Sequence, residues 1–479
     1  MRALRLASSA ALVLALAGCA LKSPPAGEEL AKTAAPNRLL PEQWTTPGGL
    51  SGDVGYRWLA TFNDPQLEAL TQEALVYNYD LRVAAARVEA TAASQKVAGA
   101  TLWPQVNLLA RGGGELSGDS SGLQVGGIFV DWELDLWGRV RAGKAANRSQ
   151  YVSAALDAEF ARQSIAAQVA KGWFLCTEAR LQRGLADDTV TAATRMTSLA
   201  LDRLRVGVGN EYDVSLAQAN LLTFRDAAQN LDLAYRQSLR SLEIIIGRYP
   251  AAAVAVPADL AAAPPPVPVG MPSSLLERRP DVIAAERRLA TAFYREEEAQ
   301  AARLPKISLT ASVSSISSEL FVLQDRENPT WSAGASILAP LFLGGKLKEQ
   351  VKVRTAEQKQ AVAEYGRIGA RAFAEVENAL SAEFALAARE VILQQAVAEN
   401  ERALRLANVR YRVGSGDLRA VLQQNLALYA SQVSLIRVRS ERLVQRVNLY
   451  LALGGSFDGQ TVDPQEGTPK AVAETSDKQ

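Results

Sequence analysis

Residues 80–104, DLRVAAARVEATAASQKVAGATLWP, recur as residues 281–305, DVIAAERRLATAFYREEEAQAARLP. The two stretches align without a gap at an offset of 201 residues (281 minus 80), and both end in proline. A second pair, 139–247 and 346–454, aligns at an offset of 207 (346 minus 139). Solenoid units are roughly 20 to 50 residues long, so a repeat of about 200 residues indicates one duplicated supersecondary block.

The second alignment contains a repeated glycine-rich reversal. Arg205-Val206-Gly207 recurs as Arg412-Val413-Gly414, and the glycine two positions later recurs as well. Glycine marks sharp turns because it adopts conformations closed to other residues. We therefore expect two tip turns, punctuated by Gly207, Gly209, Gly414 and Gly416.

Each tip turn joins a very long helix to a shorter return helix. Residues 139–205 and 346–412 contain no proline, and each spans 67 positions (205 minus 139 plus 1). At 1.5 Å per residue, each predicted helix is about 100 Å long. The return helices are predicted over 210–247 and 417–453.

A β-hairpin is predicted before each long helix. Val130, Trp132 and Leu134 alternate with Asp131 and Glu133. This period of two indicates strands with one apolar and one polar face. The hairpins are predicted over 103–137 and 305–342, each preceded by a helix, which gives a first repeat over 61–249 and a second over 273–455.

The remaining segments connect or flank the repeats. Residues 1–18 have a basic start and an apolar run, the layout of a signal peptide. Cys19 follows small residues, as at a bacterial lipidation site, so residues 19–60 are predicted as a lipid-anchored extended leader. Residues 250–272 are a proline-rich linker, and 456–479 are predicted as a disordered tail.

Composition argues against several function classes. The 52 basic and 51 acidic residues nearly cancel, so no electrostatic footprint for nucleic acid is evident. Histidine is absent, which removes the commonest general base and metal ligand. We expect no enzyme, no catalytic residues, no metal and no cofactor, and Cys176 is expected to pack in a helical seam.

The strands determine the expected architecture. Four strands with an apolar face cannot close alone, and open edges cannot sit in lipid. The predicted fold is mainly α with a small β part: a long antiparallel α-helical barrel plus a transmembrane β-barrel pooled from several protomers.

Specific strings carry a resemblance to a known family. They are Phe62-Asn63-Asp64-Pro65, Trp132-Glu133-Leu134-Asp135-Leu136-Trp137-Gly138-Arg139 and Leu276-Glu277-Arg278-Arg279-Pro280-Asp281. The chain resembles the outer-membrane efflux proteins (TolC-like), in their lipoprotein branch. The resemblance implies a homotrimer in the cell outer membrane that extends into the periplasm, the exit duct of a tripartite pump. Its implied partners are outer-membrane lipid, a periplasmic adaptor (membrane fusion) protein and an inner-membrane transporter of the resistance-nodulation-division type.

Polar residues gather at the predicted tip turns, where this family constricts its entrance. The gate candidates are Arg205, Glu211, Tyr212, Asp213, Tyr411, Arg412, Asp417 and Arg419. One hypothesis is that hydrogen bonds and ion pairs among them hold the tip closed. The alternative is a solvated turn in which Asp417 caps a helix.

Two other charged groups invite interpretation. Glu133 and Asp135 lie on one strand face near the junction with the long helix, which favours lining or junction packing over catalysis. Arg278, Arg279 and Asp281 lie at a helix start and are interpreted as a structural ion pair. Alternative functions are the exit duct of a type I protein secretion system and a structural coiled-coil lipoprotein without a pore.

Overall fold

The computed structural model describes residues 21–35, 37, 41–46, 52, 54–111, 124–317 and 329–471. The predicted signal peptide, Cys19 and residues 472–479 of the predicted tail lie outside this range. Among the described residues, no helix is both long and apolar enough to span a membrane.

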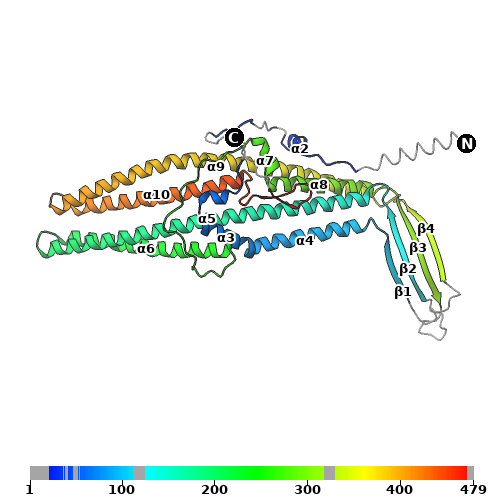
Figure 1. Cartoon of the computed structure of the whole chain (residues 1–479), viewed down its shortest axis with the longest axis horizontal. Coiled ribbons are helices and arrows are strands. Elements are labelled where there is room, and N and C mark those ends of the chain that lie inside the picture. The colour runs from blue at the N-terminus through cyan, green and yellow to red at the C-terminus, as the bar shows by residue number, and fades with distance from the viewer. Residues whose placement is uncertain are drawn as a thin grey trace.

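Long antiparallel helices form the body of the molecule, with the strands at one end and, at the other, the two turns at which the chain reverses between helices (Figure 1). Each repeat contributes a helix of 67 residues followed by a helix of 35 residues. The long helices begin and end where the sequence predicts, and the return helices begin one residue later than predicted. The four are α5 (Arg139–Arg205), α6 (Glu211–Ile245), α9 (Lys346–Arg412) and α10 (Leu418–Ala452).

Shorter helices precede the strands in each repeat. They are η1 (Trp58–Phe62), α3 (Pro65–Tyr77) and α4 (Tyr79–Ala100) in the first, and η2 (Pro272–Ser274), α7 (Leu275–Arg278) and α8 (Pro280–Ala301) in the second. The sequence predicts one helix before the first hairpin, but that helix is interrupted at Asn78. Its side chain accepts a hydrogen bond from Leu81 N at 3.1 Å and donates one to Ile245 O at 2.7 Å. This tertiary contact with α6 fixes the break.

One antiparallel sheet unites the two repeats. Its order is β1 (Gln105–Arg111), β2 (Gln124–Leu134), β3 (Lys306–Ser317) and β4 (Pro329–Leu338). The central pairing joins the repeats, with Leu134 opposite Ile307. Strands β1 and β4 form the edges, and neither has an outer strand partner in the described chain.

The predicted extended leader is wrong in part, because residues 27–34 form helix α2 (Gly27–Ala34). Eight residues are too few for a stable isolated helix. Leu30 is fully buried and α2 lies against α9, so tertiary packing stabilises it.

The predicted disordered tail is also wrong over residues 456–471. Phe457 is buried against Trp58, and Asp458 pairs with Arg162 at 2.5 Å. Strands β5 (Gln460–Val462) and β6 (Pro469–Ala471) then form a small hairpin. The polar composition of this segment predicted disorder because it gave no indication of these few tertiary contacts.

The main core lies at mid-length. Trp58, Phe62 and Phe174 form part of a cluster that also includes residues of α3, α6, α9, α10 and the linker. Trp58 stacks on Tyr450 with ring centroids 5.7 Å apart. This band ties both repeats together at the middle of the long helices, and therefore leaves the tip as a separate packing unit.

Candidate functional site

The tip turns begin with the same backbone geometry. In the first, Val208 N and Gly209 N donate to Arg203 O at 3.0 and 2.9 Å, and Gly207 has a φ of 77°. In the second, Ser415 N donates to Arg410 O at 3.0 Å. A positive φ at the residue after a helix is favourable for glycine and ends the helix with its last carbonyls satisfied. The repeated glycines therefore set both reversals.

Side-chain caps start the return helices. Asn210 Oδ1 accepts from Asp213 N at 2.8 Å, and Asp417 Oδ1 accepts from Ala420 N at 2.7 Å. Such caps typically contribute about 1 kcal/mol. Asp417 thus has the capping role that the sequence offered as the alternative to gating.

A cationic contact links the two tip turns of one chain. The Arg203 guanidinium carbon lies 4.8 Å from the centre of the Tyr411 ring. Arg203 Nη1 also donates to Tyr411 O at 3.3 Å. A guanidinium over an aromatic face is attracted by the ring quadrupole, so this pair connects the ends of α5 and α9.

Tyr411 lies in an apolar setting. It is 3% exposed, and its hydroxyl has no hydrogen-bond partner among the described residues. Burial raises the pKa of Tyr411, against a smaller lowering by Arg203. The ring therefore stays neutral and acts as a packing surface for the cation.

An apolar cluster lies behind this contact. It contains Ala200, Val214, Ala217, Tyr411, Leu418, Val421 and Leu422. A little further from the turns, Phe224 and Tyr429 meet edge to face with ring centroids 5.6 Å apart. These contacts join α5, α6, α9 and α10, so the tip of a single chain is a packed unit.

The predicted gate residues have varied surroundings. Arg205 pairs with Asp202 on its own helix at 3.2 Å. Glu211, Tyr212, Arg412 and Arg419 are exposed. Within the described chain, no two of the eight candidates form an ion pair with each other. Their gating role stays a prediction.

Sequence reasoning missed Arg203. Its counterpart at an offset of 207 is Arg410, so both repeats carry an arginine two residues before the turn. That duplication was a usable signal. The duplication does not show which of the two arginines contacts the Tyr411 ring. In the structure, Arg203 makes this contact.

Comparison with known proteins decides the family. The family model for "Outer membrane efflux protein" matches residues 70–248 and 271–455. The chain belongs to the outer membrane efflux protein family. It is 31% identical over 415 residues to the toluene efflux pump outer membrane protein TtgC of Pseudomonas putida, covering 84% of this chain and 86% of that one.

Two further comparisons agree. Identity to the pyoverdine export outer membrane protein OpmQ of Pseudomonas aeruginosa is 29% over 436 residues, covering 87% of this chain and 91% of OpmQ. The solved outer-membrane channel OprN matches with a TM-score of 0.79 at 25% identity, covering 91% of this chain and 97% of that chain. The predicted family and the mainly helical fold with a small β part are confirmed. The family consists of channels rather than enzymes.

In this efflux protein, Glu133 and Asp135 stabilise the junction between β2 and α5. Glu133 Oε2 lies 2.6 Å from Arg139 Nη2 and 3.0 Å from Lys306 Nζ. Asp135 accepts from Val140 N and from the next amide, both at 2.9 Å. These contacts engage both carboxylates in fixing the start of the long helix.

The family string around Arg279 has a comparable structural role. Arg279 is 1% exposed and contacts Asp281 at 2.8 Å and Glu375 at 2.7 Å. It also donates to Ala452 O at 3.1 Å. Burial opposes its charge, but these acceptors outweigh burial and raise the pKa of Arg279. The pair therefore joins α8, α9 and α10.

The linker is fixed by buried charges. We call residues 250–272 the strap. Glu243, 1% exposed, accepts from Ala252 N and Ala253 N at 2.6 Å each and from Val254 N at 3.2 Å. Ala252 has a φ of 57°, which costs an L-residue about 1–2 kcal/mol. The hydrogen bonds to Glu243 offset this strain.

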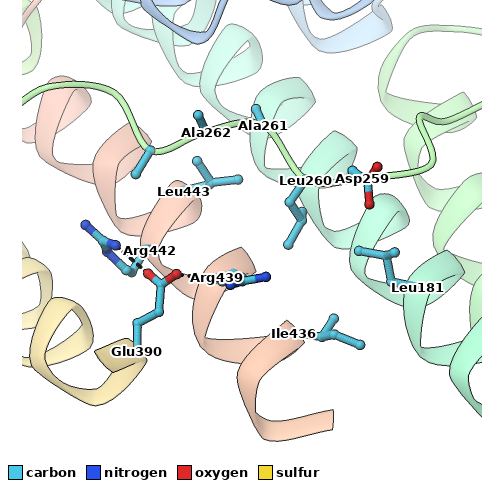
Figure 2. Close-up of a pocket in the computed structure, with 11 residues that line it drawn as sticks. Leu181, Asp259, Leu260, Ala261, Ala262, Glu390, Ile436, Arg439, Arg442 and Leu443 are labelled. Carbon is cyan, nitrogen blue, oxygen red and sulfur yellow. Dashed lines mark hydrogen bonds and ion pairs between the residues drawn. The ribbon is translucent and has the colours of Figure 1, made fainter. Parts of the chain in front are cut away.

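A cavity of about 440 Å³ lies under the strap (Figure 2). Glu390 accepts from Arg442 and, at 3.0 Å, from Arg439 on its polar side. Leu181, Leu260 and the strap alanines supply the apolar side. Burial alone would raise the pKa of Glu390, but Arg442 and Arg439 hold it below its usual range. Glu390 thus pairs with both arginines, as expected of a structural cluster, although Arg442 Nε has no hydrogen-bond partner among the described residues.

Proposed function

We propose that this outer membrane efflux protein is the exit duct of a tripartite pump, through which small solutes pass passively from periplasm to exterior. The match to efflux channels over most of the chain carries this proposal. Curated relatives are named for toluene and for pyoverdine, so small molecules of different chemistry are the expected cargo class. The energy source in this proposal is an inner-membrane transporter joined through a periplasmic adaptor.

In this proposal three copies assemble into the duct. Within the described residues, the edge strands β1 and β4 of a single chain have no outer strand partners. The single chain also exposes many large apolar side chains on its long helices, such as Leu175, Phe384 and Ile392. Three chains would provide twelve strands and twelve helices for a sheet and a helical tube. Unsatisfied edges are excluded from lipid, which supports closure by further copies.

A lipid on Cys19 would anchor the chain beside the sheet. A carbon added at Gly138, where β2 leads into α5, would lie 3.7 Å from Leu21 Cδ2. Lys22 Nζ is 3.5 Å from Glu297 Oε1 near the same junction. Leu21 follows Cys19 by two residues, at most about 7 Å of chain. These contacts support a membrane-proximal anchor.

The leader is also tied to the long helices. Glu377 accepts from Thr45 N at 2.9 Å and Thr45 Oγ1 at 2.7 Å, and from Thr46 N at 3.0 Å and Thr46 Oγ1 at 2.6 Å.

Replacing Cys19 with alanine should abolish incorporation of labelled fatty acid. Retention of the label would refute this lipidation site.

The tip is the proposed gate. Arg203 and Tyr411 hold the two turns of each chain together, and the exposed Arg412 and Arg419 are available for contacts with neighbouring copies or the adaptor. Conductance of the purified protein in planar bilayers tests the duct and its gate together. We expect a small resting conductance that rises in Arg412→Ala. Absence of any channel would refute the duct, whereas channels unaffected by tip variants would refute only the gate.

A further inference from the structure

The strap is fastened to the long helices on both sides of a short span, residues 257–263. On one side, Arg180 of α5 donates a hydrogen bond to Val256 O. On the other side, Arg446 of α10, which is 3% exposed, donates to Pro264 O at 2.9 Å. Within the described chain, the span itself forms no hydrogen bond with the helices. It therefore crosses the helices between two fixed points.

The cavity of about 440 Å³ lies beneath this span (Figure 2). The strap lines it from Asp259 to Ala263, and α5, α9 and α10 supply the rest of its wall. Three successive alanines of the span, residues 261–263, have side chains too short to fill it. Small-molecule sites commonly measure about 300–1,000 Å³, so the cavity can hold a compact ligand.

One side of the cavity is apolar. Leu181 of α5, Leu260 of the strap and Ile436 of α10 line this side, and all three are half-buried. Figure 2 shows Leu260 directed from the strap toward the helices, so its side chain reaches into the cavity. An apolar group bound here would remove surface of both partners from water, which favours binding.

The other side of the cavity carries an excess of positive charge. Arg439 and Arg442 line it together with Glu390, which pairs with both arginines (Figure 2). Arg442 Nη2 also lies 3.8 Å from Glu383 Oε1, but the same oxygen is paired with Arg446 at 2.6 Å. Three arginines thus share two glutamates, which leaves one positive charge uncompensated among these five groups.

The cationic side also has donors without acceptors. Arg442 Nε is buried and has no hydrogen-bond partner among the described residues. Arg439 contacts Glu390 through Nε at 3.0 Å, and its side chain is 47% exposed. Figure 2 shows Arg439 between Glu390 and the apolar side chains of Leu181 and Ile436. Its terminal nitrogens are therefore accessible to an acceptor that enters the cavity.

Asp259 limits the charge of such a ligand. It is an exposed residue of the strap and forms no ion pair within the described chain. Figure 2 places it beside Leu181, away from Glu390. A second acidic group on the far end of a ligand would be repelled by this carboxylate. The cavity therefore favours one anionic group at the arginines and an uncharged body beyond it.

We propose that the cavity under the strap binds a small amphipathic carboxylate, whose acid group contacts Arg439 and whose apolar body lies against Leu181, Leu260 and Ile436. A guanidinium presents paired N–H donors that match the two oxygens of a carboxylate. Such a ligand would neutralise the excess charge and would join the free span of the strap to the helices. The site lies within one chain, so this inference does not rest on the proposed function.

Calorimetric titration of the full chain in detergent tests the site, with a detergent-only titration subtracted. The probes are 2-naphthoate and its uncharged counterpart 2-naphthalenemethanol. We expect one saturable site per chain for the carboxylate. The alcohol should bind at least about tenfold more weakly, since a hydrogen bond to a charged group typically changes affinity by that factor or more.

Two cavity variants and one control locate the site. Arg439→Gln should weaken the binding of 2-naphthoate at least about tenfold and leave that of the alcohol unchanged. Arg437→Gln is the matched control on the same helix, because Arg437 pairs with Glu441 outside the cavity. Its affinity for 2-naphthoate should equal that of the wild type. Leu260→Trp should fill the cavity and abolish the binding of both probes.

Limited proteolysis provides a second measurement that needs no variant and covers a failure of Leu260→Trp to fold. A ligand that binds only the closed strap should slow cleavage within residues 257–263, and 2-naphthoate should protect more than the alcohol. Equal affinities for the two probes, no saturable binding to the wild type, or unchanged binding in Arg439→Gln would each overturn the proposal. The duct is tested by conductance instead, so failure of this site leaves the proposed function standing.

Discussion

Removal of the Arg203 side chain should loosen the tip. Arg203→Ala deletes both the guanidinium that lies 4.8 Å from the Tyr411 ring centre and the hydrogen bond to Tyr411 O at 3.3 Å. The cation–π contact contributes about 0.5–2 kcal/mol. The long hydrogen bond from a charged donor adds about 1.5 kcal/mol at most.

Arg203 is only half-buried, so solvent screening reduces the sum to about 2 kcal/mol. Each 1.4 kcal/mol is a tenfold change in an equilibrium constant. The ratio of open to closed tips should therefore rise about 30-fold for each chain that carries the variant. The variant should fold normally, because the apolar cluster behind Tyr411 is unchanged.

Planar-bilayer conductance measures this change directly. The matched control is Arg410→Ala, the repeat counterpart, which is exposed and removes the same charge. We expect frequent openings for Arg203→Ala and wild-type behaviour for Arg410→Ala. Equal conductance of the two variants would refute a specific role for the Arg203–Tyr411 contact.

Three further predictions concern stability. Glu243→Gln should lower the free energy of unfolding by about 2–4 kcal/mol and expose the strap to limited proteolysis, since buried amides lose a charged acceptor. The control is Glu401→Gln, where the side chain is 45% exposed. Equal protease resistance of the two variants would contradict the role of Glu243. Asp417→Asn should melt like wild type, whereas Asp417→Ala should lose about 1 kcal/mol because only alanine removes the cap; equal melting temperatures would show that the cap is unimportant. The pKa of Glu390 is lowered from 4.5, so the stability that this carboxylate contributes is present above about pH 4.5 and is lost as the pH falls through the lower folded pKa. Glu390→Gln should therefore flatten the dependence of melting temperature on pH in that acidic range. An unchanged slope would refute this contribution of Glu390.

Local signals were sufficient to predict the long helices and their reversals. Gly207 and Gly414 have positive φ, and proline is absent from the helices themselves. Alternating polarity indicated the strands. The repeat then placed equivalent elements in both halves, because both copies carry the same turn chemistry.

Contacts between distant segments could not be predicted in this way. Helix α2 depends on the burial of Leu30, and the ordered tail depends on Phe457 and on the pair between Asp458 and Arg162. The strap is held by Glu243, which accepts hydrogen bonds from backbone amides. Backbone amides give no side-chain signal in the sequence. Composition describes these segments as polar or proline-rich, and a few tertiary contacts override it.

The gating role of the candidate residues stays a prediction, and their list omits Arg203. All eight residues lie at or beside the two turns, yet only Tyr411 contributes to the contact between them within one chain. Helix packing, rather than the sequence of either turn, selects Arg203 as its partner. Apart from the half-buried Asp213, the other candidates are exposed in the single chain, so a gating role for them requires contacts with other copies or the adaptor.

Single-particle imaging of the detergent-solubilised protein tests the central claim most directly. The account predicts a hollow, elongated particle with threefold symmetry in end views, a helical part about 100 Å long from its 67-residue helices, and a constricted tip. Particles of single-chain mass, or filled assemblies without a central passage, would contradict a duct formed by pooled copies.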